Sequence, residues 1–83
     1  MTQVKVYGAD WCSMTKDSRQ LLDKLKVNYQ YTDIEEDAQA AQWVRAHNDG
    51  KERKPTIDIA GQVLSEPSDD ELTEALRSHK LIS

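Results

Sequence analysis

The chain has 83 residues, with 11 Lys and Arg against 15 Asp and Glu, a net charge of −4 and one cysteine. This size predicts one small domain over residues 1–83. The acidic balance disfavours nucleic-acid binding, which needs clustered Lys and Arg, and a lone cysteine excludes an intrachain disulfide scaffold. No apolar run is long enough for a membrane helix, and the first residues run directly into a strand pattern, leaving no room for a signal peptide. We therefore expect a cytoplasmic protein with no membrane partner.

Hydrophobic periodicity divides the first half of the chain into a strand, a helix and a strand. Residues 3–7 alternate polar and apolar side chains, as in a half-buried strand, and we expect this strand to stop at Gly8. Residues 13–26 place leucines at helical spacing and predict a helix. Residues 28–33 alternate again around two tyrosines and predict a second strand, which Ile34 closes.

A second helix follows an acidic segment. Residues 37–48 place Ala38, Ala41 and Val44 at three-residue steps, which predicts a helix that begins near Asp37. The acidic residues before it suit the positive end of the helix dipole. We expect the Asp-Gly pair at residues 49–50 to end the helix.

A hairpin and a last helix complete the chain. Residues 56–60 and 63–64 read as two short strands joined at a Gly-Gln turn. Ser68 and Glu71 have the spacing of a capping box, which predicts a helix that begins there and continues to residue 78 or 79.

The element order predicts an α/β fold with a four-stranded mixed sheet and three helices. A right-handed crossover makes the first two strands parallel, and the hairpin adds two further strands. In outline this is the thioredoxin-like arrangement. Asp58 lies within an apolar strand, where an unpartnered buried carboxylate is unfavourable, so we expect an edge or solvent-facing side chain.

Cys12 lies between the predicted first strand and the predicted first helix, at the point where the helix begins. Free backbone amides and the positive helix end lower a thiol pKa at such a position, although a lone cysteine can also be a small buried hydrophobe. The neighbouring Trp11 is either the wall of a binding groove or ordinary packing. Thr15 stands where a dithiol centre has its second cysteine, so any thiol exchange must use an external second thiol.

Other polar residues suggest weaker functional hypotheses. Pro55 precedes a strand and is a candidate cis proline, although a trans loop proline is the commoner case. The basic loop of residues 51–54 either steers an anionic thiol toward Cys12 or is simply a solvated loop. His47 and His79 are not spaced as metal ligands, and we predict neither a catalytic role for them nor a metal site.

The sequence resembles the glutaredoxin family, and within it the actinobacterial mycoredoxin group. The resemblance rests on five segments: Val4–Tyr7, Trp11–Cys12, Asn48–Gly50, Arg53–Ile57 and Glu66–Leu72. It spans nearly the whole chain. It implies a thioredoxin fold in which Cys12 attacks the mixed disulfide between a protein and a small thiol.

The resemblance also implies how the small thiol is bound. Pro55 would be a cis proline facing Cys12, the backbone of Lys54 and Thr56 would contact the thiol, and the start of the last helix would hold its polar end. The implied substrate-binding set is Trp11, Lys54, Pro55, Thr56, Ser68 and Asp69.

Two departures from the family pattern narrow the implied chemistry. Thr15 replaces the second active-site cysteine, which leaves the monothiol route, with glutathione or mycothiol as co-substrate and no bound cofactor. Ala9 stands where many glutathione-using members have a lysine, which weakens the case for glutathione.

The leading hypothesis is therefore a monomeric, monothiol oxidoreductase that acts on S-thiolated proteins. One alternative is a redox-inactive adaptor that uses Trp11 and the basic loop to bind a partner. A less favoured alternative is an iron–sulfur cluster carrier, because residues 13–14 differ from the Gly-Phe pair of cluster-binding monothiol glutaredoxins.

Overall fold

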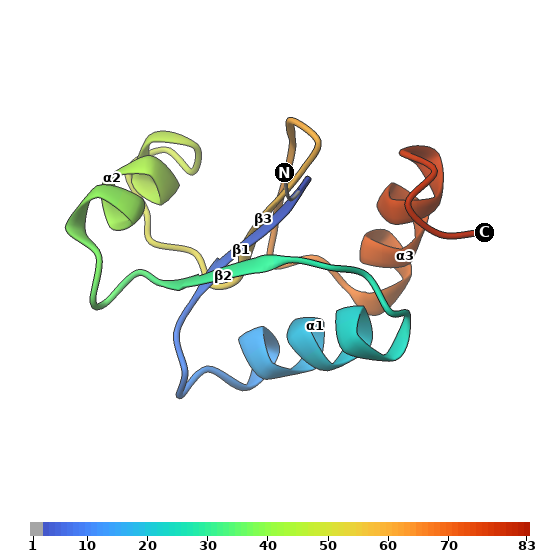
Figure 1. Ribbon diagram of the computed structural model, residues 1–83. Coiled ribbons are helices and arrows are strands. Elements are labelled where there is room, and N and C mark those ends of the chain that lie inside the picture. Colours follow the sequence, from blue (N-terminus) through green and yellow to red (C-terminus); the bar gives the residue numbers. More distant parts are fainter. Residues whose placement is uncertain (1–2) are drawn as a thin grey trace.

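The computed structural model describes residues 3–83, in which four strands form one mixed sheet flanked by three helices (Figure 1). Residues 1 and 2, on which the signal-peptide expectation partly rests, lie outside the described residues. The elements are β1 (Val4–Gly8), α1 (Ser13–Lys24), β2 (Gln30–Asp33), α2 (Ala38–Ala46), β3 (Thr56–Ile59), β4 (Gln62–Ser65) and α3 (Asp69–Ser78).

The strand order is β2-β1-β3-β4, with β1 parallel to β2 and antiparallel to β3, and β3 antiparallel to β4. This arrangement confirms the predicted fold class. None of the helices within residues 3–83 is long and apolar enough to cross a membrane.

The main core lies between the sheet and the pair α1 and α3. Alternation along β1 and β3 places their buried aliphatic side chains on this one face of the sheet. Leucines of α1 and α3 close over them, as the helix periodicity predicts. The fully or almost fully buried side chains of this core are Val4, Val6, Leu22, Ile57, Ile59, Leu72 and Leu76.

A smaller cluster lies under α2. Ala40, Ala41 and Val44 are buried there with Ile34. Of the three residues at three-residue steps, Ala41 and Val44 are buried, whereas Ala38 is exposed. The carboxylate of Asp37 accepts a hydrogen bond from the Ala40 backbone and caps the helix, so Ala38 is its first residue.

The predicted ends of the first two helices are two residues too late, because α1 ends at Lys24 and α2 at Ala46, whereas α3 ends at Ser78 as predicted. After α1 the chain turns left-handed. Lys26 has a φ of 59°, and the N–H of Val27 donates to the Leu22 carbonyl at 3.0 Å. This is a Schellman ending, which satisfies carbonyls that the helix leaves free. The same pattern follows α3, where the N–H of Leu81 donates to the carbonyl of Leu76.

The first strand ends at Gly8, as predicted, and Gly8 pairs with Asp33. The second strand begins at Gln30, two residues later than predicted. Asp58 is not on an edge strand, because β3 lies between β1 and β4; its half-buried carboxylate accepts the N–H of Gly61 in the hairpin turn.

Candidate active site

Cys12 is the N-cap residue of α1 and lies at the end of the loop that leaves β1. Its backbone N–H donates to the Ala9 carbonyl at 3.1 Å, and its carbonyl accepts the N–H of Lys16 at 3.1 Å. The partly exposed thiol lies 3.8 Å from the Lys54 carbonyl oxygen, to which it can donate. Cys12 is therefore accessible and held by both its backbone groups.

The surroundings of Cys12 favour the thiolate. Partial burial raises the pKa of this thiol, but hydrogen bonds from the Thr15 hydroxyl and from the amides of Thr15 and Met14 lower it, as does the ammonium group of Lys54. The lowering effects prevail, so the pKa lies below the ordinary value for cysteine. This agrees with the predicted effect of the helix start.

The Cys12 loop is tied to β2 and to the turn that follows it. The indole N–H of Trp11 donates to the Glu35 carboxylate at 2.8 Å, although the residue is 65% exposed. The Tyr31 hydroxyl donates to Asp10 at 2.7 Å. Trp11 therefore forms an exposed wall beside the thiol rather than part of the core.

The basic loop meets the thiol end of the sheet. The Lys54–Pro55 peptide bond is cis, and the ammonium group of Lys54 lies 5.5 Å from the Trp11 ring centroid. Arg53 is paired with Glu66 at 3.1 Å. An open hollow at this place is lined by Trp11, Cys12, Lys51, Glu52, Arg53, Lys54 and Glu66.

A buried polar network supports this loop. Asn48 donates to the Val44 carbonyl at 2.7 Å and to the Thr56 hydroxyl at 3.2 Å, and accepts a hydrogen bond from Ser65. The Thr56 hydroxyl in turn donates to the Arg53 carbonyl at 2.8 Å. The network joins α2, β3 and β4 beneath the residues that face Cys12.

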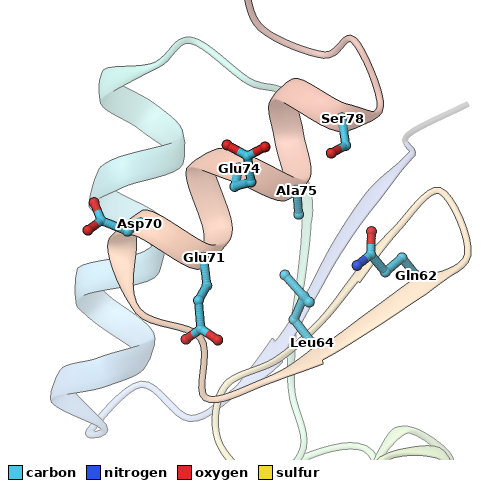
Figure 2. A pocket seen from close by; sticks show the side chains of 7 residues that line it. All are labelled: Gln62, Leu64, Asp70, Glu71, Glu74, Ala75 and Ser78. Carbon is cyan, nitrogen blue, oxygen red and sulfur yellow. The ribbon is translucent and has the colours of Figure 1, made fainter.

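Ser68 and Asp69 are not among the residues that line the hollow beside Cys12. The Ser68 hydroxyl accepts the backbone N–H of Glu71 at 3.1 Å, and the Glu71 carboxylate accepts that of Ser68 at 2.9 Å, which confirms the predicted capping box. A second hollow lies between α3 and β4, where Figure 2 shows Asp70, Glu71 and Glu74 on the helix.

The two histidines have structural partners. One ring nitrogen of His47 lies 2.8 Å from the Trp43 carbonyl oxygen, and its ring packs on Trp43. One ring nitrogen of His79 lies 2.9 Å from the side-chain oxygen of Gln62. Within residues 3–83, no group of three His, Cys, Asp or Glu side chains could hold a metal ion.

Sequence reasoning missed Glu52 and Glu66 at the site, and it missed the contacts of Thr15 and Asn48, which it had named. Thr15 is completely buried, and its hydroxyl accepts the Ala9 N–H at 3.4 Å. Glu52 and Glu66 bring negative charge to a loop that the sequence presents as basic. Asn48 was named only as part of the segment Asn48–Gly50, which resembles the glutaredoxin family. Nothing local in the sequence indicates these contacts, because each forms only when separate segments of the chain pack together.

Comparisons with known proteins agree with this geometry. The glutaredoxin family model matches residues 4–64. Mycoredoxin 1 of Corynebacterium glutamicum is 33% identical over 57 residues, which are 69% of this chain and 70% of that protein.

The crystal structure of a mutant of the thioredoxin-like protein BC3987 superposes on this structure with a TM-score of 0.83 at 25% sequence identity. The superposition covers 93% of this chain and 97% of that one. The glutaredoxin of Archaeoglobus fulgidus has the same fold, with a TM-score of 0.80 at 21% identity and coverage of 93% and 88%.

Proposed function

The chain belongs to the glutaredoxin family, and from that premise we propose that it is a monothiol oxidoreductase that reduces mixed disulfides between proteins and a small thiol. Because the chain belongs to this family, it is a glutaredoxin-like redox protein. The monothiol route and its substrates are the proposal. The observation that carries it is the accessible Cys12 thiol, which lies beside Lys54 and has a lowered pKa.

The proposed cycle has two thiol–disulfide exchanges. The Cys12 thiolate attacks the small-thiol sulfur of the mixed disulfide, the old S–S bond breaks, and the protein leaves as a thiolate that takes up a proton. A second small-thiol molecule, as thiolate, then attacks the sulfur bound to Cys12. This step releases the Cys12 thiolate and the oxidised dimer of the small thiol, so the two electrons come from the small thiol.

The hollow beside Cys12 supports binding of the small thiol there. Trp11 offers an exposed wall, and the backbone carbonyl of Lys54 lies next to the sulfur. The polar end of glutathione or mycothiol would extend toward the start of α3. The proposed binding residues are Trp11, Lys54, Pro55, Thr56, Ser68 and Asp69.

The remaining parts of the proposal concern the protein's setting. We propose a single glutaredoxin-like domain over residues 1–83 that acts as a monomer in the cytoplasm. Its partners would be the small thiol and S-thiolated proteins.

The test uses a peptide that carries glutathione or mycothiol in a mixed disulfide. Wild-type protein with excess small thiol should release the peptide thiol catalytically, and mass spectrometry should find one small-thiol molecule on Cys12. Cys12→Ser should lose both. Thr15→Cys is the matched variant that restores a second cysteine and should form an internal disulfide. Peptide release by Cys12→Ser at the wild-type rate would refute the proposal.

Two rival functions give other results. A redox-inactive adaptor, favoured by the exposed Trp11, would bind a partner but leave the peptide disulfide intact. A cluster carrier would gain visible absorption after anaerobic reconstitution with iron and sulfide, and it would lose this absorption in Cys12→Ser.

A further inference from the structure

Glu66 lies opposite Pro55, in the loop that faces Cys12. The β3–β4 ladder pairs Thr56 with Ser65, and the backbone N–H of Glu66, the next residue, donates to the Pro55 carbonyl at 2.8 Å. Glu66 has a φ of 49°, a left-handed conformation that favours glycine. Residues held in such conformations cluster at functional sites. The backbone thus fixes where the Glu66 side chain leaves the chain.

The Glu66 carboxylate is paired with Arg53. It accepts a hydrogen bond from the Arg53 guanidinium group at 3.1 Å, and both residues line the hollow beside Cys12. Within residues 3–83, Arg53 is the only arginine in that lining. A guanidinium group binds carboxylates through two parallel hydrogen bonds, which a lysine cannot provide. Glu66 therefore occupies the group of the hollow that is best suited to hold a carboxylate of a ligand.

The same pair lowers the positive charge of the hollow. Apart from Cys12, the lining has the cationic side chains of Lys51, Arg53 and Lys54 and the anionic side chains of Glu52 and Glu66. Its net charge is +1, and it would be +2 without Glu66. Because salt screens charges over about 8 Å in physiological solution, a charge in the lining affects a ligand at Cys12 more than a distant charge does.

We propose that Glu66 is a specificity-determining residue that acts through Arg53, so that the hollow discriminates against small thiols with a carboxylate near the sulfur. Thiols whose polar part is uncharged are unaffected by the pair. The inference deepens the proposed function and rests on it only for the consequence in turnover, which is that a carboxylate-bearing thiol is the poorer co-substrate.

The test compares two alkylating reagents that differ in one charge. Iodoacetamide is neutral and iodoacetate carries a carboxylate; with each, the Cys12 thiolate forms a C–S bond and iodide leaves. Cys12 is the only cysteine of the chain, so the rates report one site. Rates measured against pH give an alkylation midpoint, the pH at half the limiting rate. The ratio of the two limiting rates, iodoacetate over iodoacetamide, is independent of the thiolate fraction.

Glu66→Gln should raise this ratio about fivefold over wild type, as for a unit charge about 4 Å from the reagent's carboxylate in water. Glu74→Gln is the matched control, because Glu74 pairs with Arg77 at 3.4 Å on α3, in the second hollow (Figure 2). The control removes the same charge and should leave the ratio near that of wild type. An unchanged ratio in Glu66→Gln, or equal rises in both variants, would overturn the inference.

Two further variants test the part played by Arg53. Arg53→Gln alone leaves Glu66 unpaired and should lower the ratio, and this comparison also stands if Glu66→Gln does not fold by circular dichroism. The double variant Arg53→Gln with Glu66→Gln should return to the wild-type ratio. A double variant whose ratio stays high would show that Glu66 repels the reagent directly, which would overturn its action through Arg53.

The outcome is separate from that of the proposed function, because alkylation needs no mixed disulfide. A wild type that leaves the peptide disulfide intact would refute the proposed function, while a raised ratio in Glu66→Gln would still support the role of Glu66.

Discussion

Gly8 and Thr15 lie so close together that a Cβ atom at position 8 would stand 2.5 Å from Thr15 Oγ1 and 2.6 Å from its Cγ2. Gly8 ends β1, and Thr15 lies in the first turn of α1. The strand β1 and the helix α1, which flank the Cys12 loop, can therefore lie this close together because Gly8 has no side chain. Absence of a Cβ at this contact leaves the space that the buried Thr15 side chain occupies.

Gly8→Ala should therefore destabilise the protein. The new methyl group would overlap Thr15 in a packed interior, and overpacking of this kind costs about 1–3 kcal/mol. Urea denaturation of Gly8→Ala and wild type measures the loss. Because the methyl group displaces the Thr15 hydroxyl, the alkylation midpoint of Cys12 should also shift to higher pH.

The double variant Gly8→Ala with Thr15→Ala supplies the control. It removes the two Thr15 atoms nearest to the new methyl group, so the two stability losses should not add. Strict additivity would show that the overlap is relieved elsewhere and would contradict the contact.

The sequence predicts the order of elements and the sheet because their signals are local. Alternation in β1 and β3 and the Ser68–Glu71 spacing each depend on neighbours in the chain, and the structure confirms them. The C-terminal end of α1 is predicted less accurately. Its last turn depends on a left-handed Lys26, a conformation that is uncommon for residues other than glycine.

The site is predicted only in part, because some of its contacts do not produce a local signal in the sequence. Cys12, Trp11 and Lys54 are predicted together through the family resemblance, and the structure places them around one hollow. The contacts of Thr15 with Gly8 and Ala9 arise from the packing of a strand against a helix. No periodicity or spacing in the sequence indicates a contact of this kind.

Asn48→Ala should loosen the loop that faces Cys12. The substitution leaves the buried hydroxyl of Thr56 without one partner and removes the acceptor of Ser65. Loss of such partners costs about 1–3 kcal/mol, which urea denaturation can measure. Asn28→Ala, at an exposed position, is the matched control and should change stability little. Equal stability of the two variants would argue against a structural role for the network.

Ser68→Ala should destabilise the start of α3. The hydroxyl accepts the Glu71 backbone N–H, and loss of an N-cap oxygen costs about 0.5–2 kcal/mol. Thermal or urea unfolding measures this loss. Ser78→Ala at the other end of the helix lacks a capping role and should unfold like the wild type. If Ser68→Ala also unfolds like the wild type, the hydroxyl does not cap the helix in solution.

The other half of the capping box predicts a pH dependence. The backbone N–H and the hydroxyl of Ser68 hold the pKa of Glu71 below its ordinary value. A depressed carboxyl pKa stabilises the fold above the unfolded pKa, and this stabilisation is lost as the pH falls through the folded pKa. Wild type should therefore exceed Glu71→Ala in stability at neutral pH, and the difference should shrink in acid. A difference that stays constant with pH would rule out a contribution from the charged carboxylate.

Lys54→Gln should make Cys12 less reactive at neutral pH. The Lys54 ammonium group is one of the causes that lower the pKa of the thiol, so its removal should shift the alkylation midpoint upward. Because this effect is electrostatic and the site is open to solvent, added salt should reduce the difference between variant and wild type. Lys24→Gln removes the same charge at the far end of α1 and should leave the midpoint unchanged. Equal shifts in both variants would mean that net charge, rather than the position of Lys54 beside the sulfur, sets the thiolate fraction.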